Sequence, residues 1–212
     1  MIFDRDDFLS SIETYKHQFR NFIEQEKKNL SFLQNRFEQM GIVNSLSKLT
    51  TTDYFEFEGD ETVAKNEIIH SLHSGLMITT CGRFEYHLIL VCEVVQRALE
   101  IGVSHKDVHG SGIRNVANYF DALFKLKLSK SSEYKRVIEW LEVRNLLTHH
   151  YGTAETDKQF EKIFAVDMSF DHDSNMIFVS MNDCHRLLKD FEIFSLFLFA
   201  QLESVADESE EL

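Results

Sequence analysis

Apolar residues recur every three or four positions along the first part of the chain, which is the pattern of an amphipathic helix. The pattern runs from Asp6 to Met40, and Gly41 is expected to end it. Its apolar members are Phe8, Ile12, Tyr15, Phe19, Phe22, Leu30, Leu33, Phe37 and Met40. Charged residues occupy the other faces, so the pattern predicts one long helix that packs into a bundle or against a second subunit.

A second long helical pattern follows an irregular stretch. Residues Ile42–Gly59 show no helical period and predict a connector. Asp60 can then cap a helix that runs from Glu61 to about Glu100. Two glycines inside this helix are weak points where it can kink, Gly75 and Gly82.

Two shorter helices are predicted next. After a loop at Ser104–Gly112, the segment Ile113–Leu128 has an amphipathic helical pattern. Ser131 and Ser132 are expected to open a further helix that extends through His149 to Gly152.

Beyond Gly152 the period changes from that of a helix to that of a strand. Phe164–Phe170 alternates, Asp171–Asn175 has the composition of a turn, and Met176–Ser180 follows as a second strand, which predicts a β-hairpin. A last helix is expected to run through Leu202, with its cap at one of two residues, Asn182 or Asp183.

Composition supports a mainly α fold. The 212 residues include no proline, where about ten would be usual, and only eight glycines. A hydrophobic content of 43% is sufficient for a packed core and excludes a disordered chain. We therefore predict one domain over residues 1–212, a helical bundle with a long N-terminal helix and one small C-terminal β-hairpin.

Charge, cysteines and the N-terminus predict a cytoplasmic protein without a membrane span. The net charge of −13 disfavours nonspecific adsorption to nucleic acid or anionic membranes. Met1 is followed by acidic residues, unlike a leader peptide, and the longest apolar stretch, Phe191–Leu202, is shorter than the ~20 residues that a bilayer requires. Three cysteines without C-x-x-C spacing fit reduced thiols.

The candidate chemistry lies at the end of the helix that Ser132 opens. On a helical wheel its inward stripe holds Tyr134, Val137, Ile138 and Leu141. One turn later the stripe becomes polar, with Arg144, Asn145, Thr148 and, at its edge, His149. Polar groups on a packing face are costly unless they join a network or line a cleft, and a cleft between two copies of the helix is one solution.

The segment Arg144-Asn145-Leu146-Leu147-Thr148-His149 matches the R-x4-6-H motif of the HEPN superfamily, which the chain therefore resembles over roughly Glu61–Gly152. His149-His150-Tyr151 extends the match to the R-x4-H-x-Y form of HEPN toxins that pair with nucleotidyltransferase antitoxins. Thr79–Gln96 is also similar to the preceding helix of longer HEPN families. The long first helix, the hairpin with the terminal helix at 153–206 and the acidic tail at 207–212 exceed the minimal bundle.

The resemblance implies a homodimeric, metal-independent endoribonuclease of toxin–antitoxin or phage-defence systems. It would cleave RNA through attack of the ribose 2′-hydroxyl at a composite site formed at the subunit interface, with Arg144 and His149. His149 would move the proton of the ribose 2′-hydroxyl, since imidazole exchanges protons near neutral pH. Arg144 would hold the charged phosphate oxygens, and Asn145 would orient His149 or the phosphate. Tyr151 would be the residue that a nucleotidyltransferase modifies.

Simpler structural roles remain open for the same residues. Arg144 could form an ion pair with Glu142 or Glu85, and His149 could interact with the helix dipole. In that case the chain would be a noncatalytic helical module that binds RNA or a protein partner.

A basic segment surrounds the motif. Residues 111–153 hold seven Lys and Arg against four Asp and Glu, a net charge of +3, in a chain whose net charge is −13. RNA phosphates could approach there, with three candidate contacts at Lys130, Lys135 and Arg136. Alternatively, the lysines form a solvated helix end.

Two histidine pairs have the spacing at which metal ligands can share one helix face. His70-x2-His73 and His105-x3-His109 lack a carboxylate or cysteine at ligand spacing. We therefore predict no metal site and no cofactor.

Overall fold

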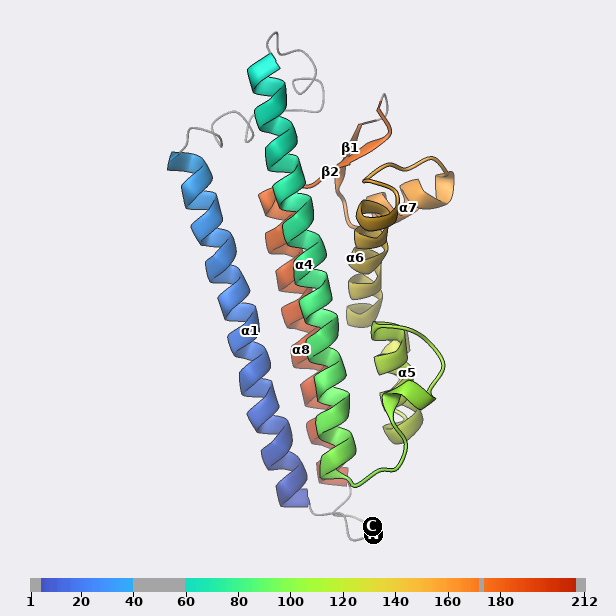
Figure 1. The fold of residues 1–212 in the computed structure, drawn as a ribbon. Coiled ribbons are helices and arrows are strands. Elements are labelled where there is room, and N and C mark those ends of the chain that lie inside the picture. Colours follow the sequence, from blue (N-terminus) through green and yellow to red (C-terminus); the bar gives the residue numbers. More distant parts are fainter. Residues whose placement is uncertain (1–4, 40–59, 172–173, 209–212) are drawn as a thin grey trace. The chain divides into compact units, whose positions relative to one another are not determined.

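The computed structural model describes residues 5–39, 60–171 and 174–208, and helices dominate them (Figure 1). The helices are α1 (Arg5–Gln39), α4 (Asp60–Ala98), α5 (Ile113–Phe124), α6 (Ser132–His149), α7 (Asp157–Ala165) and α8 (Met181–Glu208). Two short 3₁₀ helices, η1 (His105–Asp107) and η2 (Leu128–Lys130), flank α5, and β1 (Ser169–Asp171) pairs antiparallel with β2 (Met176–Phe178). The prediction of a mainly α fold with a long N-terminal helix and a small C-terminal hairpin is confirmed.

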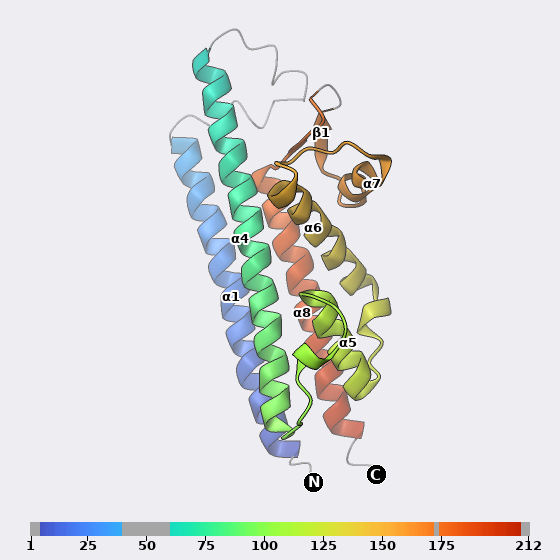
Figure 2. The ribbon, with the colours of Figure 1, turned by 45° about the vertical axis from the view of Figure 1, so that its right-hand side comes forward.

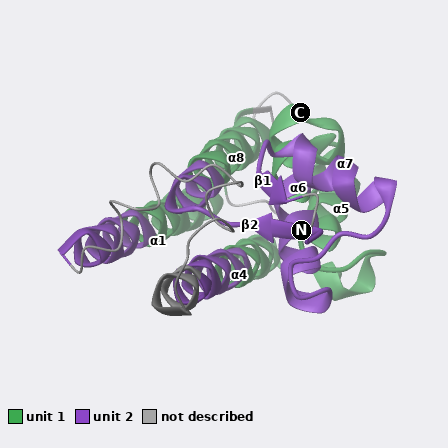
Figure 3. Ribbon diagram, turned by 90° about the horizontal axis from the view of Figure 1, so that it is seen from above, with its two compact units in different colours: residues 1–24, 82–138, 189–212 green, residues 25–81, 139–188 purple. Residues whose placement is uncertain are grey.

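The chain divides into two compact units, each assembled from separate stretches of sequence (Figure 3). Unit 1 contains residues 1–24, 82–138 and 189–212, and unit 2 contains residues 25–81 and 139–188. Helices α1, α4, α6 and α8 each contribute a part to both units, so neither unit is a continuous segment.

Aromatic side chains form the core of unit 1. Phe84 of α4 stacks on Phe191 of α8 with ring centroids 3.8 Å apart, and Phe19 of α1 contacts Phe84 edge-on at 5.6 Å. Phe19 also contacts Phe199 of α8 at 5.8 Å. These rings are almost completely buried, so the three helices share an aromatic core in this unit.

The two long helices agree closely with their sequence patterns. The first spans Arg5–Gln39, against a prediction of Asp6–Met40. The second, Asp60–Ala98, is continuous through both internal glycines, and a Cβ atom at either one would meet no other atom within 4 Å. The predicted connector at Ile42–Gly59 lies outside the described residues.

Helix α5 is shorter than predicted. It ends at Phe124 instead of Leu128, because Lys125 adopts a left-handed backbone conformation with φ of 58°. The carboxylate of Asp121 accepts hydrogen bonds from the backbone N–H of Leu128 and, at 3.2 Å, that of Ser129, so it caps the following 3₁₀ turn.

Helix α7 was not predicted, and the strand expected to begin at Phe164 begins at Ser169 instead. Thr156 and Gln159 form a capping box: the Thr156 hydroxyl accepts from the Gln159 N–H, and the Gln159 side chain accepts from the Thr156 N–H. The T-x-x-Q spacing of these residues is the sequence signal for this helix start.

The cap of α8 is Ser180, one turn earlier than Asp183. The Ser180 hydroxyl accepts from the Asp183 N–H at 3.2 Å, and the Asp183 carboxylate accepts from the Ser180 N–H at 2.9 Å. Asp183 is therefore the third residue of the helix in a reciprocal capping box, and the prediction of a cap at Asn182 or Asp183 was wrong. The helix also continues past Leu202 to Glu208.

Among the described residues, no helix is both long enough and apolar enough to cross a membrane.

Candidate functional site

The last turns of α6 carry the predicted site residues, and their burial decreases toward the helix end. Trp140, Leu141 and Val143 are buried in unit 2. Arg144 and Asn145 are half-buried, and Thr148 and His149 are exposed. Leu146 and Leu147 remain buried at the end of the helix, whereas Tyr134 and Ile138, both predicted to face inward, are half-buried. The buried face of α6 therefore stays apolar to its end, and the polar residues lie beside that face.

The backbone at the end of α6 turns sharply after the site. The Leu146 carbonyl accepts from the N–H of His150 at 3.0 Å and from that of Gly152 at 3.2 Å. Tyr151 has a φ of 53° and is 90% exposed, while Gly152 has a φ of 77°. Because the Gly152 carbonyl accepts from the Ile177 N–H of β2 at 2.8 Å, the hairpin fixes the chain where α6 ends.

The three proposed catalytic residues lie within two turns of one helix. Asn145 and His149 are four residues apart and share a face, whereas Arg144 and His149 are separated by ~140° around the helix. The Thr148 hydroxyl donates to the Arg144 carbonyl at 2.8 Å, so it is occupied within the helix.

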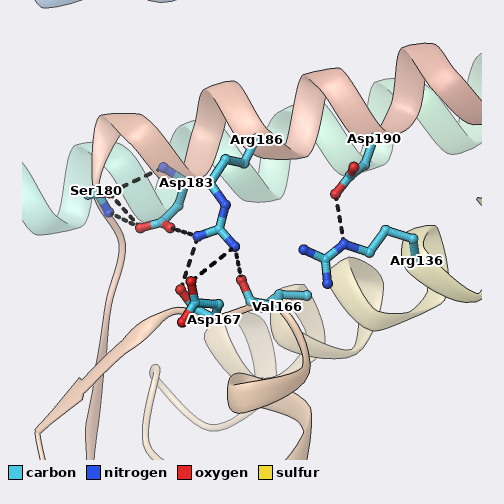
Figure 4. Close-up of polar contacts among 7 residues, drawn as sticks. All are labelled: Arg136, Val166, Asp167, Ser180, Asp183, Arg186 and Asp190. Atoms are coloured by element: carbon cyan, nitrogen blue, oxygen red, sulfur yellow. Dashed lines mark hydrogen bonds and ion pairs between the residues drawn. The ribbon is translucent and has the colours of Figure 1, made fainter.

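The proposed phosphate contacts lie in unit 1, on or just before the first turn of α6. Lys130, in η2, and Lys135 are exposed. Arg136 is half-buried, and its guanidinium donates to the Asp190 carboxylate of α8 at 3.0 Å (Figure 4). Part of the positive charge of this segment is therefore neutralised by an acidic residue 54 positions away in sequence.

The structure gives a further neighbour for each of the two acidic residues proposed as ion-pair partners of Arg144. The Glu142 carboxylate accepts from the Lys162 ammonium of α7 at 2.7 Å. Glu85 belongs to unit 1, where a Cβ atom on Gly112 would collide with its carboxylate oxygen. Glu85 thus lies close to the N-terminus of α5, where a helix dipole favours negative charge.

A polar cluster around Arg186 connects the elements of unit 2, and sequence analysis did not predict it (Figure 4). The Arg186 guanidinium donates to the backbone carbonyls of Val166 and, at 3.0 Å, Asp167. It also donates to the Asp183 carboxylate at 3.2 Å and lies 5.7 Å from the centre of the Trp140 ring. The cluster ties the end of α7 to the start of α8, a structural role that satisfies its polar groups internally.

His70 and His73 bracket the backbone of Val179, immediately after β2. The Val179 N–H donates to His70 Nδ1 at 3.4 Å, and His73 Nδ1 lies 3.1 Å from the Val179 carbonyl oxygen. The spacing considered for metal ligands therefore positions the strand end against α4. Within the described residues, no group of three or more His, Cys, Asp or Glu side chains is arranged to hold a metal ion.

Burial lowers the pKa of both histidines. The nearby His73 lowers the pKa of His70 further, whereas the Val179 carbonyl and the Asp183 carboxylate partly oppose the effect on His73. Burial is also the main cause of a lowered pKa at His87, which stacks on Phe22 in unit 1.

These lowered values predict acid-sensitive stability. A histidine in an unfolded chain has a pKa of about 6.5, so below that pH the unfolded state binds protons that the folded state excludes. The free energy of unfolding should therefore fall as the pH drops below about 6.5, until the folded-state pKa is reached. Urea denaturation at pH 7 and pH 5 measures this loss, and His73→Gln should make it smaller. His17→Gln, at an exposed histidine of α1, is the control, and an equal loss in both variants would contradict the assignment.

The three cysteines are buried free thiols, and burial raises the pKa of two of them, Cys92 and Cys184, the latter to about 12. A thiol is nucleophilic only as its thiolate. Neither Cys92 nor Cys184 is therefore a candidate nucleophile at neutral pH.

Comparison of the chain with protein-family models, with curated proteins and with solved structures found no match in any of the three.

Proposed function

We propose that the chain is a metal-independent endoribonuclease of the HEPN type that acts in the cytoplasm as a homodimer, in a toxin–antitoxin or phage-defence context. The observation that carries this proposal is the end of α6, where His149 is exposed and Arg144 is half-buried two turns or less from the helix end.

The proposed reaction is an internal transesterification of RNA. Neutral His149 takes the proton of a ribose 2′-hydroxyl, and the resulting oxygen attacks the adjacent phosphorus. The bond from phosphorus to the 5′-oxygen breaks, and that oxygen takes up a proton from imidazolium or water. The products are a 2′,3′-cyclic phosphate and a 5′-hydroxyl, so the step needs no oxidant and no second substrate.

In this proposal Arg144 binds the phosphate, and Asn145 orients His149 or the phosphate. A guanidinium is permanently charged and can bind two phosphate oxygens, and this interaction strengthens as negative charge builds on them. Asn145 lies one turn before His149 on the same face and would orient the imidazole or the phosphate.

A noncatalytic module that binds RNA is the second candidate. The exposure of Lys130 and Lys135 favours it, because exposed lysines contact phosphates without any chemistry. Such a module would retain RNA in a manner that weakens with salt, and would leave it intact.

Tyr151 is the candidate for regulation by a nucleotidyltransferase antitoxin. Its 90% exposure in a turn makes the hydroxyl accessible to a modifying enzyme. The intact mass of the protein, after co-expression with such an enzyme, would increase by one or more nucleotides, and an unchanged mass would remove this part of the proposal.

Cleavage of single-stranded RNA by the purified chain in EDTA tests the proposed function. We expect cut RNA with 2′,3′-cyclic phosphate ends, and no cutting of DNA of the same sequence, which lacks the 2′-hydroxyl. Retention of intact RNA in a gel shift, without products, would support the binding module instead. Equal cutting of RNA and DNA would exclude the proposed transesterification.

A further inference from the structure

The outer face of α8 in unit 1 carries an exposed apolar seam. Ile193 is 43% exposed and Leu196 is 49% exposed, and Ala200, one turn further on, is exposed as well. Phe197 lies beside them and is half-buried. Exposed aliphatic side chains that follow one another along a helix are typical of an interaction surface.

The spacing of the exposed residues is that of a coiled-coil seam. The exposed positions from Lys189 onward are Lys189, Ile193, Leu196, Ala200, Ser204 and Asp207, which fall within about 80° of one another around the helix. Steps of four, three and four residues between the first four are the a/d spacing of helices that pair along their length. The core residues Phe191, Leu198 and Leu202 lie on the opposite face, so the seam is additional to the surface that the fold already uses.

Neighbouring elements fix α8 on both sides of the seam without covering it. The Lys16 ammonium of α1 pairs with Glu203, and the Arg136 guanidinium of α6 pairs with Asp190. The course of α8 alongside α6 is visible in Figure 2. The seam is therefore held on a rigid helix, as a docking surface requires.

We infer that the outer face of α8 binds the same face of a second copy of this chain, with the two helices antiparallel. The seam has a positive end at Lys189 and a negative end at Asp207, about 27 Å apart along the axis. An antiparallel pair centred midway between them puts Lys189 opposite the partner's Asp207 and Leu196 opposite the partner's Ala200. Because the arrangement is two-fold symmetric, the same Lys189–Asp207 contact forms at both ends of the helix pair.

The charges along the seam favour an antiparallel second copy over a parallel copy or an anionic membrane. A parallel pair would place Lys189 opposite the partner's Lys189, and Asp207 opposite the partner's Asp207. An anionic membrane would be repelled by the acidic residues along the seam, Glu192, Glu203 and Asp207. Lys189 forms no ion pair within the described residues, and the Asp207 side chain is 70% exposed although it pairs with Arg5.

This surface lies outside Glu61–Gly152, the part of the chain on which the HEPN resemblance depends. The α8 pairing and the proposed function have only one expectation in common, a two-fold dimer, and the evidence for the pairing comes from the α8 surface. Its test measures molecular mass, so it can fail while RNA cleavage succeeds, and the reverse.

Sedimentation equilibrium of the full chain, at concentrations up to about 200 µM, tests the surface, because a seam of this width predicts a weak dimer. We expect a mass that approaches twice 24.8 kDa for the wild type, and a monomer for Leu196→Glu at every concentration. Leu72→Glu, at an exposed leucine of α4, is the control for a charge on an apolar surface residue and should remain dimeric. A monomeric wild type, or a Leu196→Glu variant that dimerises normally, would overturn the inference.

Charge reversal tests the antiparallel orientation. Lys189→Glu and Asp207→Lys should each weaken the dimer about tenfold or more, and the double variant should regain most of the wild-type affinity. A parallel pair predicts no such restoration, because each reversed residue would still face its own copy. Failure of the double variant to recover would overturn the proposed pairing, as would binding of a monomeric wild type to anionic vesicles at the same face.

Discussion

Alanine in place of His149 or Arg144 should reduce the rate of RNA cleavage by about 10²–10⁴-fold. This is the usual contribution of one general base or of one group that stabilises a developing oxyanion. His149 is exposed at the end of α6, so its removal should leave the fold intact and act on the chemistry alone. The measurement is the single-turnover rate on a short labelled RNA.

His150→Ala is the matched control, because His150 is also a histidine, lies next to His149 and is exposed as well. Arg144→Lys separates charge from geometry, because lysine keeps the positive charge and loses the planar fork that binds two oxygens. We expect His150→Ala to cleave at the wild-type rate and Arg144→Lys to remain strongly impaired. If His149→Ala cleaved as fast as His150→Ala, the assignment of the base would be wrong.

Phe84→Ala should lower the free energy of unfolding by about 3–5 kcal/mol, the largest effect on stability that we expect from one core substitution. Phe84 is completely buried, stacks on Phe191 and contacts Phe19 and Phe194 edge-on at 5.6 and 6.3 Å. Alanine would remove the transfer free energy of the ring and leave a cavity among three other aromatic rings. Urea denaturation followed by circular dichroism measures the loss.

Tyr86→Ala is the control on the same helix, because this ring is 59% exposed. Its effect should stay within about 0.5 kcal/mol. Equal midpoints for the two variants would mean that the aromatic core of unit 1 is not the main source of stability.

The long helices could be predicted because a repeated apolar stripe carries their signal. In α1 and α4 the same period continues for more than 30 residues, so the errors are limited to the termini. Short elements lack this repetition. Residues of α7 were assigned partly to a strand because Phe164 and Val166 fit a two-residue period by chance, while the capping box at Thr156 carried the correct signal.

Turns that depend on one backbone angle were also missed. Lys125 ends α5 in a left-handed conformation, although lysine has no special preference for it. The compensation comes from Asp121, whose carboxylate binds the backbone seven residues later. Such contacts combine residues from different turns, and no local propensity encodes them.

In the candidate site, too, some features follow from helical periodicity and others depend on tertiary contacts. The polar end of α6 follows from the sequence alone, because helical periodicity places Arg144, Asn145 and His149. The ion pair of Arg136 with Asp190, and the contacts of Arg186 with the end of α7, depend on tertiary packing. Helical periodicity therefore gives the chemical groups of the motif, whereas long-range contacts such as these become known only from the structure.

Chemical rescue tests most directly whether the imidazole of His149 and the guanidinium of Arg144 act on a phosphodiester. Free imidazole added to His149→Ala should restore RNA cleavage in proportion to its concentration, and guanidinium should do the same for Arg144→Ala but not for His149→Ala. A folded His149→Ala variant whose cleavage rate is unchanged from wild type, or whose lost activity does not respond to imidazole, would contradict the account.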